Sequence, residues 1–415
     1  MTMVDTQSAR ADGLPSYAMF AGVLAAAGLP IYIHAPKFYA DTFGVSLTAL
    51  GGALFALRLL DVVQDPLLGR LAARLGPWRG VGAAVALAFM ALAMFGLFAI
   101  NPPGAPLLWF AIMLAVLFSA YSFLNILFYA RGVAKAATVG PEGHLRVARW
   151  RETGALLGVC LAAIVPSLAA LISGHPFSVF AALFAVAALC AGLAMRLEWS
   201  TVAATVTGGF RTVLGDPVSR RLLLIALVNT TPVAVSSTLF LFFVESRLAA
   251  PGAEGPLLLL FFLAAAGAAP FWSRAAERFG ARRVLMAGML LSILAFGLVP
   301  LLGPGDIALF ALICVASGAA LGADMTLLPA MFARRLAQIA PDGNEAFGLW
   351  SFATKFTLAF AAVTLLPVLD AAGFVPGTEN TTDALRWLTF LYAGIPCVLK
   401  IAAIGMLSTL TRENT

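Results

Sequence analysis

The sequence predicts an all-α polytopic membrane protein, with twelve transmembrane helices arranged as two pseudo-repeated six-helix halves. Hydrophobic residues make up 61% of the 415 residues and charged residues 11%, against about 25% charged in soluble domains. No soluble fold hides so much apolar surface from water. Basic loops fall on alternate sides of successive apolar windows, and the two halves carry similar charged turns. These three observations give the number, orientation and pairing of the spans.

Twelve apolar windows are each long enough to cross a bilayer, which takes about 20 helical residues. In the first half they cover residues 17–35, 45–69, 80–100, 106–130, 150–173 and 177–196. In the second half they cover residues 220–245, 256–273, 283–302, 307–333, 346–370 and 386–410. We therefore expect one bundle over residues 1–197, a linker over residues 198–218, and a second bundle over residues 219–415.

The charges in the loops predict the orientation. The loops that follow even-numbered windows are rich in arginine, whereas the other loops hold only Lys37, Arg247 and Arg386. By the positive-inside rule the basic loops and both termini are cytoplasmic. We expect a monomer in the lipid bilayer of a bacterial inner membrane. The net charge of +6 lies in these loops and does not indicate binding of nucleic acid.

The second window places Arg58, Asp61 and Asp65 on one face of a helix that is otherwise apolar. Each such charge costs about 2.5–3.5 kcal/mol near the centre of a span, so it usually faces a bundle interior or a water-filled path. Two carboxylates one turn apart repel, which favours a cation or a proton between them. Lys355 lies at a similar depth, ten residues after Glu345. The alternative is a static network of these charges that ties two spans together.

Other polar residues within the windows are candidates for contact with a solute. Tyr121, Asn125 and Tyr129 share a face of the fourth window, which suits a flat ligand or ordinary helix packing. Arg151 opens the fifth window and Asn229 lies in the seventh. Asp324 and Lys400 lie at similar depth in the tenth and twelfth windows, where they form an ion pair or contact the solute.

Two charged turns, about 204 residues apart, mark the repeat. Gly69-Arg-Leu-Ala-Ala-Arg-Leu-Gly76 follows the second window, and Ser273-Arg-Ala-Ala-Glu-Arg-Phe-Gly280 follows the eighth. Both resemble the conserved loop motif of the major facilitator superfamily. The segment Arg58-x-x-Asp61-x-x-x-Asp65-Pro66 more closely resembles the melibiose-permease type, the glycoside–pentoside–hexuronide:cation symporters.

The resemblance implies a cation site of Asp61 and Asp65, the ligands of Na⁺ if Na⁺ is the coupling ion, with Ser122 at a hydroxyl position. Lys355 in Ser351-Phe-Ala-Thr-Lys355 would be a tethered cation, and Ser351 a solute contact. The acids with which that family grips a galactoside fall at Ala25 and Asn125 here.

The sequence therefore predicts a secondary carrier, a symporter coupled to Na⁺ or H⁺, for a small solute such as a sugar or glycoside. An amphiphilic cargo (a lysolipid, a peptidoglycan fragment or a drug) is the alternative, because both sugar-gripping acids are absent. A membrane enzyme is not expected, since the three histidines form no catalytic or metal-binding pattern. No cofactor is expected beyond the coupling ion.

Overall fold

The structure is a computed structural model that describes residues 13–140, 142–199, 209–340, 342–375 and 379–410, and these are almost entirely helical. The first part of the chain forms α1 (Leu14–Ala26), α2 (Leu29–Phe43), α3 (Leu47–Arg74), η1 (Gly76–Trp78), α4 (Arg79–Phe98), α5 (Pro106–Val139), α6 (Gly143–Ala169) and α7 (Pro176–Trp199). The second part forms α8 (Phe210–Gly215), α9 (Pro217–Phe242), η2 (Phe243–Arg247), α10 (Glu254–Phe279), α11 (Ala281–Gly297), η3 (Val299–Leu301), α12 (Ile307–Ile339), α13 (Asn344–Ala371), α14 (Thr382–Thr389), η4 (Phe390–Gly394) and α15 (Ile395–Ser408).

Each of the twelve predicted windows falls on helix, which confirms the all-α membrane fold. Within the described residues, ten helical stretches are long and apolar enough to cross a bilayer. The first window is divided, contrary to the prediction of one continuous span. Gly28 adopts a non-helical conformation (φ −92°, ψ −117°) and a proline stands in the first turn of α2, so α1 and α2 are separate helices. The second window is α3, whose 28 residues include the charged face.

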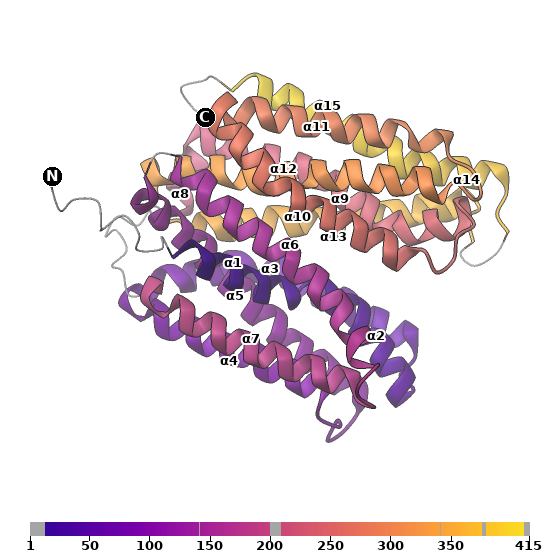
Figure 1. Cartoon of the computed structure of the whole chain (residues 1–415), viewed down its shortest axis with the longest axis horizontal. Coiled ribbons are helices and arrows are strands. Elements are labelled where there is room, and N and C mark those ends of the chain that lie inside the picture. Colours follow the sequence, from indigo (N-terminus) through magenta and orange to yellow (C-terminus); the bar gives the residue numbers. More distant parts are fainter. Residues whose placement is uncertain (1–12, 141, 200–208, 341, 376–378, 411–415) are drawn as a thin grey trace, which may run out of the picture.

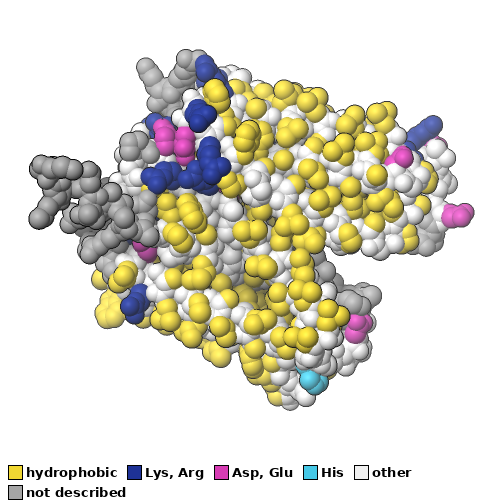
Figure 2. Space-filling view, in the orientation of Figure 1, with side chains coloured by type: hydrophobic (Ala, Val, Ile, Leu, Met, Phe, Trp, Pro, Cys, Tyr) yellow, Lys and Arg dark blue, Asp and Glu magenta, His cyan; other side chains and the backbone are white. Residues whose placement is uncertain are grey.

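Figure 1 shows α1 to α7 as one group of helices and α9 to α15 as another. The two groups meet where α3 packs on α13 and α6 packs on α10. Figure 2 shows an apolar surface along the bundle, with a dense group of Lys, Arg, Asp and Glu side chains at one end and a few charged side chains at the other. We call the end with the dense group the basic end; the turns after α3, α5 and α10 lie there. At the opposite end, near α2 and α14, a deep notch separates the two groups (Figure 2).

Glycines allow α1 and α6 to touch through their backbones. A Cβ built on Gly154 would lie 2.1 Å from the carbonyl oxygen of Ala18, and one built on Gly158 would lie 2.2 Å from that of Gly22. Such contacts between residues without side chains are a common way to pack helices in membranes, where the hydrophobic effect does not drive helix association. The pair α1–α6 is therefore a rigid part of the first group.

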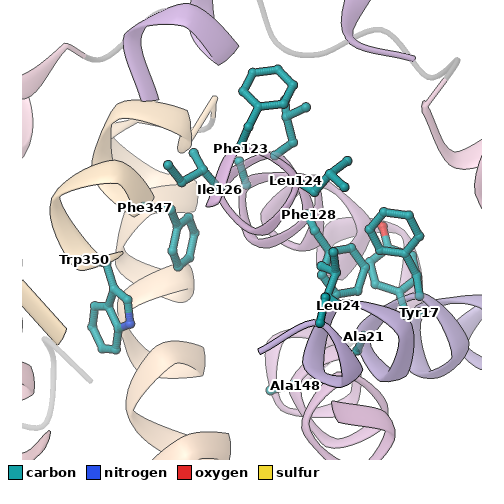
Figure 3. Close-up of a cluster of buried hydrophobic side chains, with 14 of the residues drawn as sticks. Tyr17, Ala21, Leu24, Phe123, Leu124, Ile126, Phe128, Ala148, Phe347 and Trp350 are labelled. Carbon is teal, nitrogen blue, oxygen red and sulfur yellow. The ribbon is translucent and has the colours of Figure 1, made fainter. Parts of the chain in front are cut away.

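Aromatic side chains fill the space around α5 (Figure 3). The ring of Phe128 packs on Tyr17 of α1, with ring centroids 5.2 Å apart. On the other side of α5, Tyr129 packs on Phe347 of α13 at 5.3 Å. The core is thus continuous from the first group of helices into the second at this level.

The basic end is closed by direct contact between the groups. A Cβ on Gly348 of α13 would lie 3.0 Å from the carbonyl oxygen of Asp65 and 3.2 Å from the Cα of Gly69, both on α3. Arg79, at the start of α4, also forms an ion pair with Asp342, which precedes α13. The two helices therefore meet through their backbones on the basic-end side of the charged face.

The chain between the two groups is also tied to this closed end. The backbone N–H of Phe210 donates to Glu345 of α13 at 2.7 Å, and the Arg70 guanidinium of α3 lies 4.7 Å from the centre of the Phe210 ring. Asp216 caps the start of α9 and accepts from Arg335. This hydrogen bond from Arg335 lowers the pKa of Asp216 to about 2.

Candidate functional site

Asp61 and Asp65 lie buried on α3 at the boundary between the two groups of helices. Lys355 reaches them from α13. Its Nζ atom lies 2.7 Å from Asp61 Oδ1 and 3.1 and 3.0 Å from the two oxygens of Asp65. The structure thus brings together three predicted residues that are about 290 positions apart in the chain, as the residue numbers show. The ammonium lies between the carboxylates, where an alkali cation would otherwise be attracted.

Hydroxyl and amide groups of α3 and α5 complete the shell of Asp61. Ser122 donates to Asp61 Oδ1 at 2.8 Å and also contacts the Lys355 ammonium. Gln64 donates to the same oxygen at 3.2 Å and accepts from Ser119 at 2.9 Å. Ser119 was missed in the sequence reasoning, although it precedes Ser122 by one helical turn and therefore shares its face. These oxygen atoms suit a hard monovalent cation as well as a proton.

The charges of the cluster do not balance. Asp61 and Asp65 supply two negative charges and Lys355 one positive charge, which leaves −1 for the three side chains. A net charge inside a helix bundle is costly, so binding of one further monovalent cation or one proton to these side chains is favourable. Pro66 follows Asp65 and has no N–H, which leaves the carbonyl of Val62 without its helical donor. That oxygen is a further potential ligand.

Two other predicted residues, Arg58 and Ser351, lie beside the cluster. Arg58 is half-buried one turn before Asp61 on α3, and it is Lys355 that contacts both carboxylates. Ser351 is buried on α13, with its hydroxyl near Asp65. Its position supports the carboxylate more directly than it supports contact with a solute.

The predicted face of α5 continues from this cluster toward the basic end. Tyr121, Asn125 and Tyr129 are all half-buried, and the Tyr121 ring centre lies 5.8 Å from the Lys355 ammonium. Tyr129 donates to Glu152 of α6 at 2.9 Å. Arg151 donates to the same carboxylate at 2.6 Å, with its guanidinium 3.6 Å from the centre of the Tyr129 ring. Tyr129 and Arg151 are therefore held in a buried network, whereas Tyr121 and Asn125 remain at its edge.

Asn229 and Asp324 lie in a second buried cluster, within the second group of helices. Lys400 of α15 forms an ion pair with Asp324 of α12 and donates to the Asn229 side chain of α9 at 2.7 Å. Lys400 is only 2% exposed. This cluster links three helices of one group, α9, α12 and α15.

Comparison with known proteins agrees with this architecture. The family model for MFS/sugar transport proteins matches residues 15–411. No curated protein sequence shows a significant match. Among solved structures, a bacterial homologue of the iron transporter ferroportin in an outward-facing state is similar, with a TM-score of 0.70 and 15% identity over 95% of this chain and 99% of that one. The human organic anion transporter MFSD10 (TETRAN) gives a TM-score of 0.62 and 17% identity over 95% of this chain and 98% of that one.

Proposed function

Because this chain belongs to the MFS/sugar transport protein family of the major facilitator superfamily, we propose that it is a cation-coupled symporter of a small solute. The coupling ion is Na⁺ or H⁺, and the solute is a sugar or another small organic molecule. The two bundles, residues 13–199 and 209–410, alternate their opening around a site at mid-depth. The basic end lies in the cytoplasm of a bacterial inner-membrane protein, so the notch at the opposite end faces outward.

The observation that carries this proposal is the Lys355 ammonium between Asp61 and Asp65. Lys355 comes from one bundle and both aspartates from the other, so the cluster connects the parts that must move. A cation that binds the carboxylates competes with the ammonium for the same oxygens. Its binding releases Lys355 and loosens the contact of α3 with α13. The ion thereby controls the movement on which transport depends.

The solute would bind next to the released lysine. Tyr121 and Asn125 line the half-buried face of α5 there, and an aromatic ring beside an amide suits a sugar ring. A solute that contacts Lys355 would hold it away from the carboxylates and so favour the ion-loaded site. The affinities for solute and ion would then rise together, which is the requirement for symport.

An amphiphile is a second candidate cargo, favoured by an aromatic row on α13. Phe352, Phe356 and Phe360 stack at centroid distances of 6.0 and 5.9 Å, and the last two are 42% and 52% exposed. An alkyl glycoside and the corresponding free sugar discriminate the candidates. Stabilisation of the purified protein by the glycoside alone favours the amphiphile, whereas equal stabilisation by both favours the sugar.

The first experiment follows the unfolding temperature of the purified protein in NaCl, LiCl, KCl and choline chloride and as a function of pH. We expect a rise with Na⁺ or Li⁺, or a dependence on pH, that is lost in Asp61→Asn and Asp65→Asn. Asp324→Asn is the matched control, because it neutralises a buried carboxylate in the other cluster and should keep the ion response. A wild-type protein indifferent to ions and pH, or a response that survives in both aspartate variants, would rule out coupling at this site.

A further inference from the structure

A cavity of about 620 Å³ opens at the basic end, outside the site described above. Its size falls within the range of about 300–1,000 Å³ that is usual for small-ligand sites. The α5–α6 turn and the start of α6 form one wall, and the α10–α11 turn with α12 forms the other. The cavity therefore lies between the two groups of helices, on the side where α6 packs on α10.

Its charged lining favours an anion. Three guanidinium groups line it, from Arg282, Arg283 and Arg334, against the carboxylates of Glu142 and Glu277. Glu277 is already compensated by Arg149, whose Nη1 lies 3.5 Å from its Oε1. The cavity therefore retains an excess of positive charge.

The positions of the arginines are partly fixed in advance. Arg282 donates to the carbonyl oxygens of Ser408 and Leu410 at the end of α15, so its side chain is held without loss of its charge. Arg283, the next residue of α11, is exposed at the rim of the cavity. The first turn of α6, at Gly143 and His144, lines the facing wall, and the positive end of the helix dipole there favours anions.

Phosphate is the anion that this geometry fits. Guanidinium groups bind phosphate oxygens through paired hydrogen bonds. Phe279 lies on the rim and is 63% exposed, which marks the apolar edge of the bilayer beside the arginines. Basic pockets between helices on the cytoplasmic side of a membrane recognise phosphate-bearing headgroups.

We propose that this cavity binds a phosphate group, carried by an anionic lipid or by a soluble phosphate ester, which bridges α11 and α12 to the start of α6. A bridging ligand stabilises the contact between the two groups at the basic end. The proposal does not depend on which ion or solute the protein carries.

The test uses the full-length protein in neutral detergent micelles. Its unfolding temperature is titrated with phosphatidylglycerol, with phosphatidylcholine of the same acyl chains, and with glycerol phosphate. The double variant Arg283→Gln/Arg334→Gln removes two of the lining charges. Arg196→Gln is the matched control, because Arg196 is an exposed arginine at the end of α7 and does not line the cavity. Arg283→Lys, which keeps the charge at the rim, tests for the paired hydrogen bonds.

We expect stabilisation of the wild type, with a half-saturating concentration at least about tenfold higher in the double variant and unchanged in the control. Arg283→Lys should fall between the wild type and the double variant. An effect of phosphatidylglycerol without one of glycerol phosphate assigns the lipid headgroup, and equal effects assign a soluble phosphate ester. The proposal is overturned if neither compound acts on the wild type, if phosphatidylcholine acts as strongly, or if the double variant responds like the wild type.

Discussion

Replacement of Lys355 by glutamine tests whether the Lys355 ammonium competes with the coupling ion for the carboxylates or is a static structural charge. The Lys355 Nζ atom lies 2.7 Å from Asp61 Oδ1 and 3.0 Å from Asp65 Oδ2. At an effective dielectric constant of about 20, one such pair of charges attracts by about 6 kcal/mol before the cost of burying the ammonium. Removal of one partner from a buried ion pair costs about 3–5 kcal/mol in practice. We expect the ion-free Lys355→Gln protein to be destabilised by about that amount.

The same substitution should strengthen the binding of the coupling ion. If the proposed ion binds the carboxylates, it must displace the ammonium in the wild type, whereas in Lys355→Gln the two carboxylates are available and repel each other. If the ion recovers about half of the lost stability, about 2 kcal/mol, its apparent affinity rises about 30-fold. For a proton-coupled carrier, the same gain appears as proton uptake at higher pH.

Thermal unfolding with a thiol-reactive dye, in a Cys190→Ala background that removes the exposed thiol, measures both quantities, because Cys160 and Cys314 are buried and react on unfolding. The control is Lys400→Gln, which breaks the remote pair with Asp324. It should lower the unfolding temperature and leave the ion response as in the wild type. An ion response that is unchanged or abolished in Lys355→Gln would refute competition and make Lys355 a static part of the contact between α3 and α13.

Three further predictions concern packing and pH. Gly348→Leu should open the basic end, because its Cβ meets the α3 backbone at 3.0 Å. Spin labels on α3 and α13 in a cysteine-free background should therefore move apart. An unchanged distance between the labels would contradict the closure of the basic end by this contact. Gly158→Leu should prevent stable folding, since its Cβ would lie 2.2 Å from α1, whereas Gly267→Leu, with nothing within 4 Å, should fold and keep its unfolding temperature. The pair of Asp216 with Arg335 should contribute about 2 kcal/mol above the unfolded pKa of 3.8 and lose it as the pH falls through about 2. The stability difference between the wild type and Asp216→Asn should therefore shrink over this window; a difference that is constant with pH would exclude the charged pair as its source.

The helices and the charged face can be predicted from the sequence because both depend on local patterns. Apolar windows of sufficient length predict spans, and a spacing of four places Asp61 and Asp65 on one face. Similar depth in the membrane also brought Lys355 into the predicted site, although depth does not say which helices are neighbours. Which helices are neighbours depends on packing between segments that are distant in the sequence. Tyr129 illustrates the difference: its spacing suggests a solute contact, and only the fold shows it bonded to Glu152.

The break in the first window has a similar origin. The hydropathy of the window favours one helix, whereas the backbone conformation of Gly28 and the proline in the first turn of α2 break it. Closure of the basic end was also beyond the sequence, because the contact of Gly69 with Gly348 involves no side chain. A glycine in a membrane span indicates that another helix packs closely there, but it does not identify that helix.

The net charge of the three side chains Asp61, Asp65 and Lys355 has an electrical consequence. Asp61, Asp65 and Lys355 together carry −1 when no ion is bound and zero when one Na⁺ or proton is bound. A membrane potential therefore acts mainly on the unloaded protein, by up to about 2.3 kcal/mol per 100 mV if the charge crosses the whole field. If the protein is the proposed symporter, a negative interior pushes that charge outward and so speeds the return of the empty carrier. The potential would then set the turnover rate through the return step, while the loaded step would be nearly insensitive to voltage.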